Sequence, residues 1–405
     1  MVFNVNMMDE LIRISDRIVS NTSNDFERYL LHEIEWEDRL IGLTGARGVG
    51  KTTMMLQYLK KHWKSSRSWI YVSLDNFYFL KNRLFDFAEE FYLKGGRHLF
   101  IDEVHHYPHW SMDIKNLYDI YHDLKIVFSG SSALQIHKAE ADLSRRAAIY
   151  NLHELSFREY LVLSGKYDGE VYSFEEVLKN HGEISLEITK GKSIIPWFNE
   201  YLNEGIYPFF KEAKGQYHER LNSVINIIIE RDLQVLEKIS YATVYKLKML
   251  VALLADNVPY QVNITALSSK TGLSRDVLLR LLGVLDRANL IKNIRLAGSS
   301  AGYLTKPDKI YMNNTSLLSS LHSGNVSIVG TMRETFFMNQ MCKSHVVKSA
   351  KKGDFIIDNK YLFEIGGRKK TFDQITDLPN SYVAADDLEV GYHNKIPLWL
   401  FGFMY

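Results

Sequence analysis

The sequence predicts an α/β protein with three modules: an N-terminal parallel sheet flanked by helices, a middle helical module with a small wing, and a C-terminal α/β module. Its 405 residues correspond to two or three domains of about 150 residues each. Over the first 165 residues, short apolar runs alternate with stretches of helical periodicity. A glycine-rich loop separates the first of these strands from the helix that follows it. We expect domains at 1–165, 241–315 and 316–405, with a helical linker at 166–240.

The composition narrows the class of protein. Hydrophobic residues make up 46% and charged residues 24%, as in ordinary folded domains, which excludes collagen-like and low-complexity chains. No apolar run approaches the ~18 residues of a membrane-spanning helix, and the first residues do not have the pattern of a signal peptide. The single cysteine, Cys342, excludes an intrachain disulfide and a zinc site built from cysteines. We therefore expect a cytoplasmic protein without a membrane partner.

Charge is distributed unevenly although the net charge is only +1. Residues 244–296 and 343–370 each contain eight Lys/Arg and three Asp/Glu, a local charge of +5. Residues 154–204 contain ten acidic and five basic residues, a local charge of −5. Such blocks either are solvated faces or contact a partner, and a basic block can contact nucleic acid.

The first module begins with helical periodicity over residues 8–33. Apolar strands are then predicted at 40–44, 69–74, 98–101 and 124–128, with helical stretches between them. This alternation favours parallel strands joined by helical crossovers.

A phosphate-binding loop follows the first strand. The segment matches G-x-x-x-x-G-K-[ST] between a strand and a helix, the context that the motif requires. Its backbone N–H groups are expected to face phosphates, and the helix N-terminus adds partial positive charge. Lys51 would neutralise the β- and γ-phosphates and Thr52 would supply a Mg²⁺ ligand. The expected nucleotide contacts are Gly45, Ala46, Arg47, Gly48, Val49, Gly50, Lys51, Thr52 and Thr53.

Polar residues end two later strands of the same module. Asp102 and Glu103 follow the third strand, about fifty residues after the loop, as a P-loop ATPase requires. Asp102 would hold Mg²⁺, and Glu103 would act as general base toward water. Ser129 ends the fourth strand and could reach the γ-phosphate or the attacking water. An ordinary polar strand end is the alternative for Ser129.

Three histidines follow Glu103 and raise the question of a zinc site. His105 and His109 flank Pro108, which disfavours the helix that would align them, and no cysteine is near. We therefore expect His105, His106 and His109 to lie in a solvated loop packed by Trp110.

The combination of these motifs resembles a known family. The motifs are the P-loop, the Ile101-Asp102-Glu103 strand end, Trp110, Ser129-Gly130-Ser131-Ser132, the run 141–150 and Leu155-Ser156-Phe157-Arg158-Glu159-Tyr160-Leu161. Together they resemble a prokaryotic AAA-like ATPase family (AAA family 14), whose members carry a C-terminal domain of unknown function 4143. Similarity continues downstream at 201–208, 227–232, 330–334 and 354–355.

The resemblance implies that an arginine follows the fourth strand. It places Arg146 in the position of a residue that acts on the γ-phosphate of its own or a neighbouring subunit. Arg145 stands where the family usually has glycine, so either arginine can be the acting one. A surface arginine without a catalytic role is the alternative.

The middle module is predicted to be a winged helix-turn-helix. Thr265 is expected to cap a short helix, Gly272 to form the turn, and Ser274 to cap a helix over residues 275–288. Strands at 290–295 and 309–312 would form the wing. Arg275, Arg280 and Arg287 are the expected DNA contacts on the second helix. A protein-docking role is the alternative, since a fold alone does not decide function.

The last module resembles the core of restriction endonucleases, in degenerate form. Glu334 is expected on a helix at 331–341, with Asp354 and Glu364 on the two following strands. In that core, carboxylates hold Mg²⁺ and a lysine positions the nucleophilic water. The position of the lysine is Gly366, which argues against cleavage, although Arg368, Lys369 or Lys370 could substitute. The apolar segment 396–405 is expected to be a buried strand.

These observations predict an enzyme that binds and slowly hydrolyses ATP with Mg²⁺. Its nucleotide state would be coupled to a partner, with DNA favoured over protein. One alternative is a nucleotide-gated switch for protein interaction. The other is a metal-dependent nuclease controlled by ATP. The sequence leaves the oligomeric state open.

Overall fold

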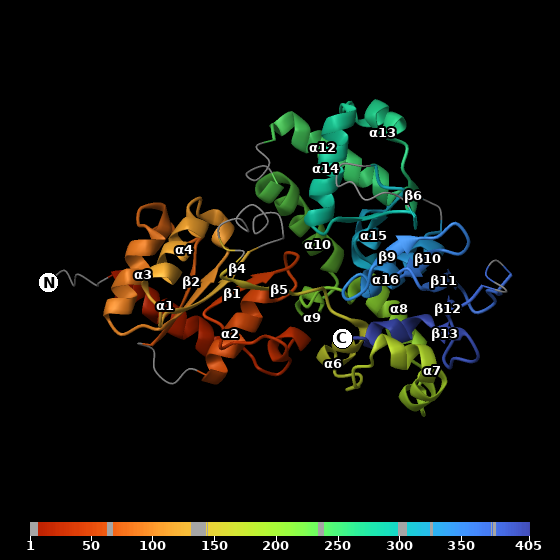
Figure 1. The fold of residues 1–405 in the computed structure, drawn as a ribbon, viewed down its shortest axis with the longest axis horizontal. Coiled ribbons are helices and arrows are strands. Elements are labelled where there is room, and N and C mark those ends of the chain that lie inside the picture. Colours follow the sequence, from red (N-terminus) through yellow and green to blue (C-terminus); the bar gives the residue numbers. More distant parts are fainter. Residues whose placement is uncertain are drawn as a thin grey trace. The chain divides into compact units, whose positions relative to one another are not determined.

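The fold is taken from a computed structural model of the chain (Figure 1), which describes residues 7–62, 68–130, 143, 145–233, 239–298, 306–324, 327–373, 375 and 378–405. The chain divides into two compact units, Met1–His153 and Glu154–Tyr405, which we describe separately. In the described part of the chain, no helix has both the length and the apolar character needed to cross a membrane.

The N-terminal unit is organised around a parallel sheet of five strands. They are β1 (Leu40–Thr44), β2 (Trp69–Ser73), β3 (His98–Asp102), β4 (Lys125–Ser129) and β5 (Ala148–Asn151). Their order across the sheet is β2-β3-β4-β1-β5, and every neighbouring pair is parallel. The predicted parallel sheet is therefore confirmed. Because the carboxyl ends of parallel strands meet at one edge, the residues that follow β1, β3 and β4 lie near one another there.

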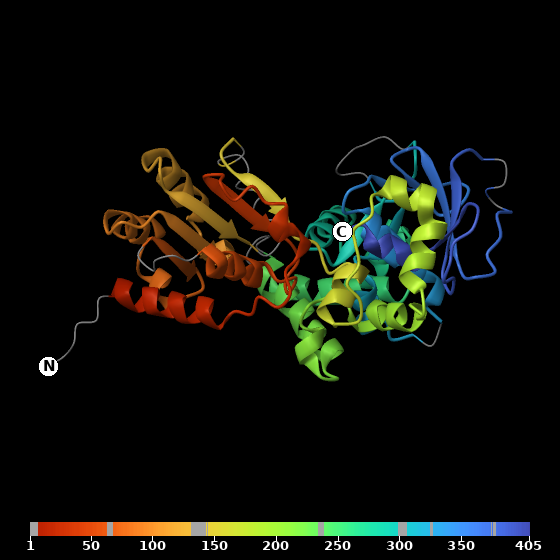
Figure 2. The ribbon, with the colours of Figure 1, turned by 90° about the horizontal axis from the view of Figure 1, so that it is seen from below.

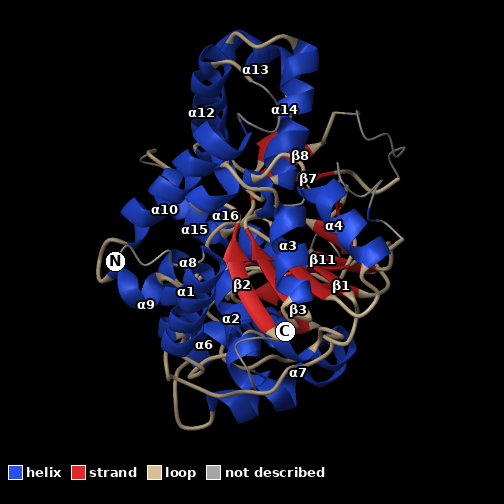
Figure 3. Cartoon of the chain, turned by 90° about the vertical axis from the view of Figure 1, so that its left-hand side faces the viewer, coloured by secondary structure: helices blue, strands red, loops and turns tan. Residues whose placement is uncertain are grey.

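Helices cover both faces of this sheet (Figure 3). They are α1 (Met7–Asn21), α2 (Lys51–His62), α3 (Leu84–Leu93) and α4 (Trp110–Ile120), with short helices η1 (Tyr29–His32), η2 (Phe77–Leu80) and η3 (Val104–His106). Helix α1 packs against α2 and β2, whereas α3 packs against α4. The helical pattern predicted over residues 8–33 is in fact α1 followed by the separate short helix η1.

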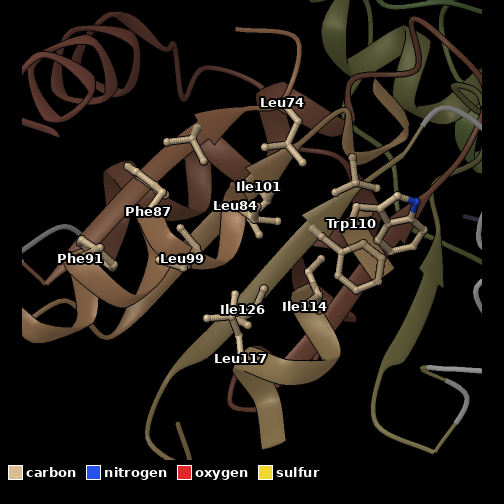
Figure 4. Packing of buried hydrophobic residues seen from close by; sticks show 14 of the residues in the cluster. Leu74, Leu84, Phe87, Phe91, Leu99, Ile101, Trp110, Ile114, Leu117 and Ile126 are labelled. Carbon is tan, nitrogen blue, oxygen red and sulfur yellow. The ribbon is translucent and has the colours of Figure 1, made fainter. Parts of the chain in front are cut away.

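The core beneath α3 and α4 follows directly from helical periodicity. Helix α3 buries Leu84, Phe87, Ala88 and Phe91, at positions i, i+3, i+4 and i+7. Figure 4 shows three of these side chains and those of Trp110, Ile114 and Leu117 meeting the apolar strand residues Leu99, Ile101 and Ile126. This packing fixes β3 and β4, whose ends carry the candidate catalytic residues.

The second unit begins with a group of helices. They are α6 (Phe157–Leu163), α7 (Phe174–Thr189), α8 (Ile195–Glu204), α9 (Phe210–Ala213), α10 (Tyr217–Ile227) and the π-helical η4 (Ile228–Asp232). Two further helices of this unit, α15 (Thr315–Leu321) and α16 (Val329–Met341), come later in the chain. Capping boxes start α6 at Ser156 and α7 at Ser173, each with a glutamate three residues later. The segment predicted as a linker is thus largely helical, and α10 packs on α15.

Three helices and a small sheet follow in the middle of the second unit. They are α12 (Tyr241–Ala255), β6 (Tyr260–Gln261), α13 (Ile264–Thr271), α14 (Arg275–Arg287), β7 (Ile291–Ile294) and β8 (Lys309–Met312). The sheet is antiparallel in the order β6-β8-β7. Asn263 caps α13 by accepting a hydrogen bond from Ala266 N at 3.0 Å, so the expectation that Thr265 is the cap was wrong. Ser274 occupies the N-cap position of α14, as expected, but its side chain makes no capping hydrogen bond.

The chain ends in a mixed five-stranded sheet. Its strands are β9 (Val347–Ser349), β10 (Phe355–Ile357), β11 (Tyr361–Gly366), β12 (Ser381–Ala385) and β13 (Lys395–Pro397), in the order β13-β12-β11-β10-β9. Strands β9, β10 and β11 pair antiparallel, and β11, β12 and β13 pair parallel. Helix α7 lies along this sheet and contacts β13 (Figure 2).

The final apolar segment is only partly the expected strand. Strand β13 ends at Pro397, which lacks the N–H needed to extend the ladder, and the 3₁₀ helix η5 (Leu398–Phe403) follows. All six residues of η5 are buried. The carbonyl oxygen of Tyr405 accepts hydrogen bonds from Ser156 Oγ at 2.7 Å and Arg158 Nε at 3.0 Å, which joins this end of the unit to its first helix.

Candidate nucleotide site

The glycine-rich loop has the backbone geometry that only glycine permits. Gly45 has φ +142°, and a Cβ atom there would lie 2.2 Å from the carbonyl oxygen of Leu152. Gly50 has φ +100° immediately before α2. A side chain at Gly45 would force the loop away from the residue that follows β5, and one at Gly50 would be strained by its positive φ.

A buried arginine forms hydrogen bonds that stabilise this loop. Arg28 is 3% exposed, and its guanidinium donates to the carbonyl oxygen of Val49 in the loop. The same group donates to the carbonyl oxygen of His153 at 2.7 Å. Arg28 therefore connects the loop to the chain that leaves β5. Arg28 could not be predicted from the sequence, because it lies outside the motif and no local pattern marks it.

Lys51 begins α2 and lies against its own loop. Its Nζ donates to the carbonyl oxygens of Gly45 at 2.9 Å and Ala46 at 3.0 Å. The ammonium group is therefore held where the loop would enclose phosphates, with the N-terminus of α2 adjacent.

Asp102 is the centre of a hydrogen-bond network at the end of β3. Its Oδ2 accepts from Thr52 Oγ1 at 2.6 Å and from the Tyr71 hydroxyl at 2.9 Å. Its Oδ1 accepts from Ser129 Oγ and from Glu103 N at 3.0 Å. The structure thus brings together four residues that were predicted from three separate segments, because β1, β3 and β4 end at the same edge of the sheet.

Tyr71 is the member of this network that sequence analysis did not predict. It lies within β2, one strand from β3, and its hydroxyl is buried beside a carboxylate. Burial, followed by the charge of Asp102, raises the pKa of Tyr71 well above its usual value, so the hydroxyl remains a hydrogen-bond donor. The alternation of strand residues could have indicated its inward direction but not its partner.

The donor atoms at this network fit a magnesium ion. Mg²⁺ prefers oxygen ligands such as carboxylates, hydroxyls and water. The Thr52 hydroxyl and the Asp102 carboxylate already lie 2.6 Å apart, beside the phosphate-binding loop. Asp102 is 3% exposed, and each of its oxygens accepts two hydrogen bonds, so its orientation is fixed.

Glu103 occupies an unusual backbone conformation at the start of η3. Its φ and ψ are 52° and 43°, in the left-handed region, which is sparsely populated for residues other than glycine. Its Oε2 lies 3.2 Å from His105 Nδ1. The His105 side chain is only 4% exposed, so the expectation of a solvated loop was wrong for this residue. Trp110 is buried, as expected, and starts α4.

Arg146 lies at the other edge of the same sheet. It lies two residues before β5, whose first residue, Ala148, pairs with Ile41 near the start of β1. The loop at 45–53 follows the opposite end of β1. Arg146 forms a two-point ion pair with Asp119, with Nε and Nη2 at 2.9 and 3.0 Å from the two carboxylate oxygens. The structure therefore does not bring Arg146, or the adjacent Arg145, to the loop of its own chain.

The second unit contains the expected group of carboxylates. Glu334 Oε2 accepts from the buried Tyr311 hydroxyl at 2.7 Å, and Asp354 Oδ2 accepts from Ile365 N at 2.7 Å. Burial, followed by the charge of Glu334, raises the pKa of Asp354 to about 7. Burial also raises the pKa of Glu334, and the charge of Glu364 acts in the same direction. The three acids are therefore close enough to disfavour one another's charged forms.

Lys370 occupies the space left open by Gly366. A Cβ atom on Gly366 would lie 2.6 to 2.8 Å from the Cβ, Cγ and Cδ atoms of Lys370. The Nζ of Lys370 forms an ion pair with Oε1 of Glu364, whose side chain is 2% exposed. The buried Lys395 donates to the carbonyl oxygens of Arg368 at 2.7 Å and Lys370 at 2.8 Å, which holds this turn. Of the three basic residues considered as substitutes, Lys370 is the one paired with the carboxylate.

The predicted DNA contacts lie on α14. Arg275 and Arg280 are exposed and Arg287 is half-buried. The buried face of the helix consists of Leu278, Leu281, Leu282, Val284 and Leu285. The part of the predicted wing at residues 299–305 lies outside the described residues.

Two family models match parts of the chain. Residues 37–161 match an AAA domain family (AAA family 14). Residues 195–327 match a domain of unknown function (DUF8612). The second match is not the expected domain of unknown function 4143, which stays a prediction.

Relatives and solved structures are similar to the chain at low identity. An uncharacterized protein (MJ1637) of Methanocaldococcus jannaschii is 27% identical, over 88% of this chain and 81% of that protein. AMPPCP-bound DnaA from Aquifex aeolicus has a TM-score of 0.28 and 13% identity, over 68% of this chain and 88% of that one. PCH-2 from C. elegans has a TM-score of 0.24 and 19% identity, over 40% of this chain and 46% of that one. These TM-scores are too low to support any argument about the whole chain. The family match is to an AAA domain, a kind of P-loop domain found in ATPases, and the residues it covers include strands β2, β3, β4, β1 and β5 of the parallel sheet.

Proposed function

We propose that the protein hydrolyses ATP with Mg²⁺ and that its nucleotide state controls a DNA partner. The observation that supports hydrolysis most is the network in which the side chains of Thr52, Asp102 and Ser129 and the backbone N–H of Glu103 meet beside the glycine-rich loop. A loop that only bound phosphate would not require a base placed next to a metal-binding carboxylate.

Each residue has a role that follows from its position. The backbone N–H groups of the loop and the Lys51 ammonium would bind the β- and γ-phosphates. Thr52 and Asp102 would hold Mg²⁺, which neutralises charge on the phosphates when it is bound. Ser129 would orient the attacking water or the γ-phosphate. Glu103 would accept a proton from that water at a carboxylate oxygen.

The site of hydrolysis is tested by ATP turnover of purified protein. Lys51→Ala should abolish ATP binding or hydrolysis, because it removes the ammonium group that the glycine-rich loop holds. Lys61→Ala, which removes an exposed lysine from the far end of the same helix, is the matched control and should retain turnover. Equal turnover in wild type and Lys51→Ala would refute the assignment.

Arg146 would act on the nucleotide of a neighbouring copy of the chain. Its position at the edge of the sheet away from its own loop favours action in trans. Mixing the Lys51→Ala and Arg146→Ala variants tests this: each should be inactive alone, and the mixture should regain activity at interfaces that pair an intact loop with an intact arginine. No recovery would argue against action in trans.

The partner proposed for the second unit is DNA. The element order α12-β6-α13-α14-β7-β8 with its antiparallel sheet favours a winged helix, and α14 presents Arg275 and Arg280 to solvent. Duplex DNA should therefore stimulate ATP turnover in a salt-sensitive way. Arg275→Ala and Arg280→Ala should reduce the stimulation and leave basal turnover unchanged. Stimulation that persists in both variants would point to another surface, and no effect of any DNA would favour a protein-docking switch.

A second candidate function is metal-dependent cleavage of nucleic acid by the C-terminal sheet. The pairing of Lys370 with Glu364 favours this function, because Lys370 places a lysine beside the carboxylates, where the sequence position expected to supply it holds Gly366. Plasmid should be incubated with Mg²⁺ or Mn²⁺ and wild type, Asp354→Ala or Lys370→Ala. Lys369→Ala is the control for the neighbouring exposed lysine. Cleavage that disappears in the first two variants but not in Lys369→Ala would support it, and equal plasmid integrity in all samples would refute it.

A further inference from the structure

We infer that Glu103, His105 and His106 form a binding site for a transition-metal ion such as Zn²⁺, and that occupation of this site stops ATP hydrolysis while leaving ATP binding intact. The inhibitory effect rests on the proposed function of Glu103 as general base. The metal site itself rests only on the geometry of the three side chains.

The three side chains already converge. One potential ligand atom from each residue lies within 4.8 Å of those of the other two. Among the residues that the structure describes, this is the one group of three or more His, Cys, Asp or Glu side chains with such spacing. His109, which was considered with them from the sequence, is not a member.

A tight backbone turn causes this convergence. Residues Val104–His106 form a 3₁₀ helix, and His106 N donates to the carbonyl oxygen of Glu103 at 3.0 Å. Glu103 is the N-cap residue of this turn, so all three side chains come from four consecutive residues of one tight turn. Val104 is fully buried in the core and anchors the turn.

The spacing of the Glu103–His105 pair is close to that of two ligands of bound zinc. Zn–N and Zn–O distances of about 2.0–2.1 Å at tetrahedral angles separate two ligand atoms by about 3.4 Å. Glu103 Oε2 and His105 Nδ1 are 3.2 Å apart, so this pair needs little rearrangement. The rings of His105 and His106 lie 4.2 Å apart between centroids at 35°, so the second imidazole can reach the ion by a side-chain rotation.

The donor atoms select against the ion used for catalysis. Two imidazoles and one carboxylate, with a fourth position left for water, are a common zinc ligand set. Mg²⁺ prefers oxygen ligands, which Thr52 and Asp102 supply. The two ions would therefore occupy different places in the same active site.

Metal binding would remove the proposed base from the reaction. A carboxylate oxygen that coordinates zinc no longer accepts a proton from water at neutral pH. The loop, Lys51, Thr52 and Asp102 are not ligands of this ion, so ATP binding would remain. Zinc would hold the protein in its ATP-bound state.

The metal site can be tested without ATP. Co²⁺ is the spectroscopic probe, because its visible absorption reports tetrahedral coordination, and Zn²⁺ affinity is measured by calorimetry. Wild type should bind one equivalent, and His106→Gln and His105→Gln should each lose at least about tenfold in affinity. The control His109→Gln should match wild type. Equal affinity in wild type, His105→Gln and His106→Gln would overturn the site, even if zinc binds elsewhere.

The inhibitory effect is tested by turnover at saturating Mg²⁺ and ATP with buffered free Zn²⁺. Turnover of wild type and His109→Gln should fall as zinc rises. His106→Gln, compared with its own zinc-free rate, should require at least about tenfold more zinc, and ATP affinity should not change. Zinc that binds through His106 but leaves turnover intact would overturn the inhibition. Absence of turnover without zinc would refute the ATPase proposal and leave the Co²⁺ result as the test of the metal site.

Discussion

Replacement of Arg28 by alanine should weaken both the N-terminal unit and its affinity for nucleotide. The guanidinium is 3% exposed and donates to the carbonyl oxygens of Val49 and His153. A hydrogen bond from a charged donor contributes about 1.5–3 kcal/mol, so two such bonds correspond to roughly 3–6 kcal/mol. At about 2–4 °C per kcal/mol for a unit of this size, 3 kcal/mol lowers the melting temperature by about 6–12 °C.

The effect on the affinity for ATP follows from the conformational freedom that the glycine-rich loop gains in Arg28→Ala. Fixing one residue of a mobile loop costs about 1 kcal/mol, and 1.4 kcal/mol is a factor of ten in affinity. If one or two loop residues must be ordered again on binding, the Kd for Mg²⁺-ATP should rise about tenfold.

Two measurements check this reasoning. Thermal unfolding should show a lower first transition in Arg28→Ala, and calorimetry should show weaker binding of a nonhydrolysable ATP analogue. Arg17→Ala, which removes an exposed arginine from α1, is the control. If Arg28→Ala had the same melting temperature and Kd as Arg17→Ala, the proposed role of Arg28 in stabilising the loop would be refuted.

Three further predictions concern single side chains. Glu103→Gln should bind ATP like wild type but lower kcat at least about 100-fold, because an amide cannot accept the proton; wild-type turnover in a single-turnover assay would exclude Glu103 as the base. Tyr71→Phe removes one donor to Asp102 and should raise the Mg²⁺ concentration for half-maximal turnover without loss of fold, as measured by Mg²⁺ titration and circular dichroism; an unchanged titration would contradict this. The pKa of Asp354 is about 7 in the folded protein, against a usual value of 3.8. Folding therefore favours the protonated carboxyl group, and this contribution to the stability of the second unit is complete below about pH 4 and is lost as pH rises through 7. Asp354→Asn should therefore stabilise the second unit at pH 8, by at most about 4 kcal/mol, and have no such effect at pH 4; equal melting shifts at both pH values would show that the charge of Asp354 is not responsible.

The sequence was most informative where a motif and its structural context coincide. The strand before the P-loop, the helix after it and the carboxylates after β3 could be placed from alternating apolar runs, and the parallel sheet then implied that Asp102 and Ser129 would be close. Residues outside any motif could not be placed in this way. Arg28 and Tyr71 reach the site only through tertiary packing, and neither has a neighbour in sequence that marks its role.

Local backbone conformation also limits what the sequence can predict. Pro108, between His105 and His109, correctly indicated that no α-helix aligns these two histidines. A 3₁₀ turn instead brings Glu103 and His106 together. Similarly, Gly366 correctly indicated a missing lysine, whereas the return of Lys370 depends on a turn held by Lys395 from a distant strand. In both cases the decisive contact is set by backbone geometry that the one-letter pattern does not encode.

The contact between Ser156 and Tyr405 has a consequence for synthesis of the protein. It joins residues 249 positions apart, and both belong to the second unit, whereas the first unit is complete at His153. At a translation rate of about 5–20 residues per second, roughly 12–50 seconds separate the emergence of these two residues from the ribosome. The unit that contains the glycine-rich loop therefore leaves the ribosome first and can begin to fold before the second unit is complete.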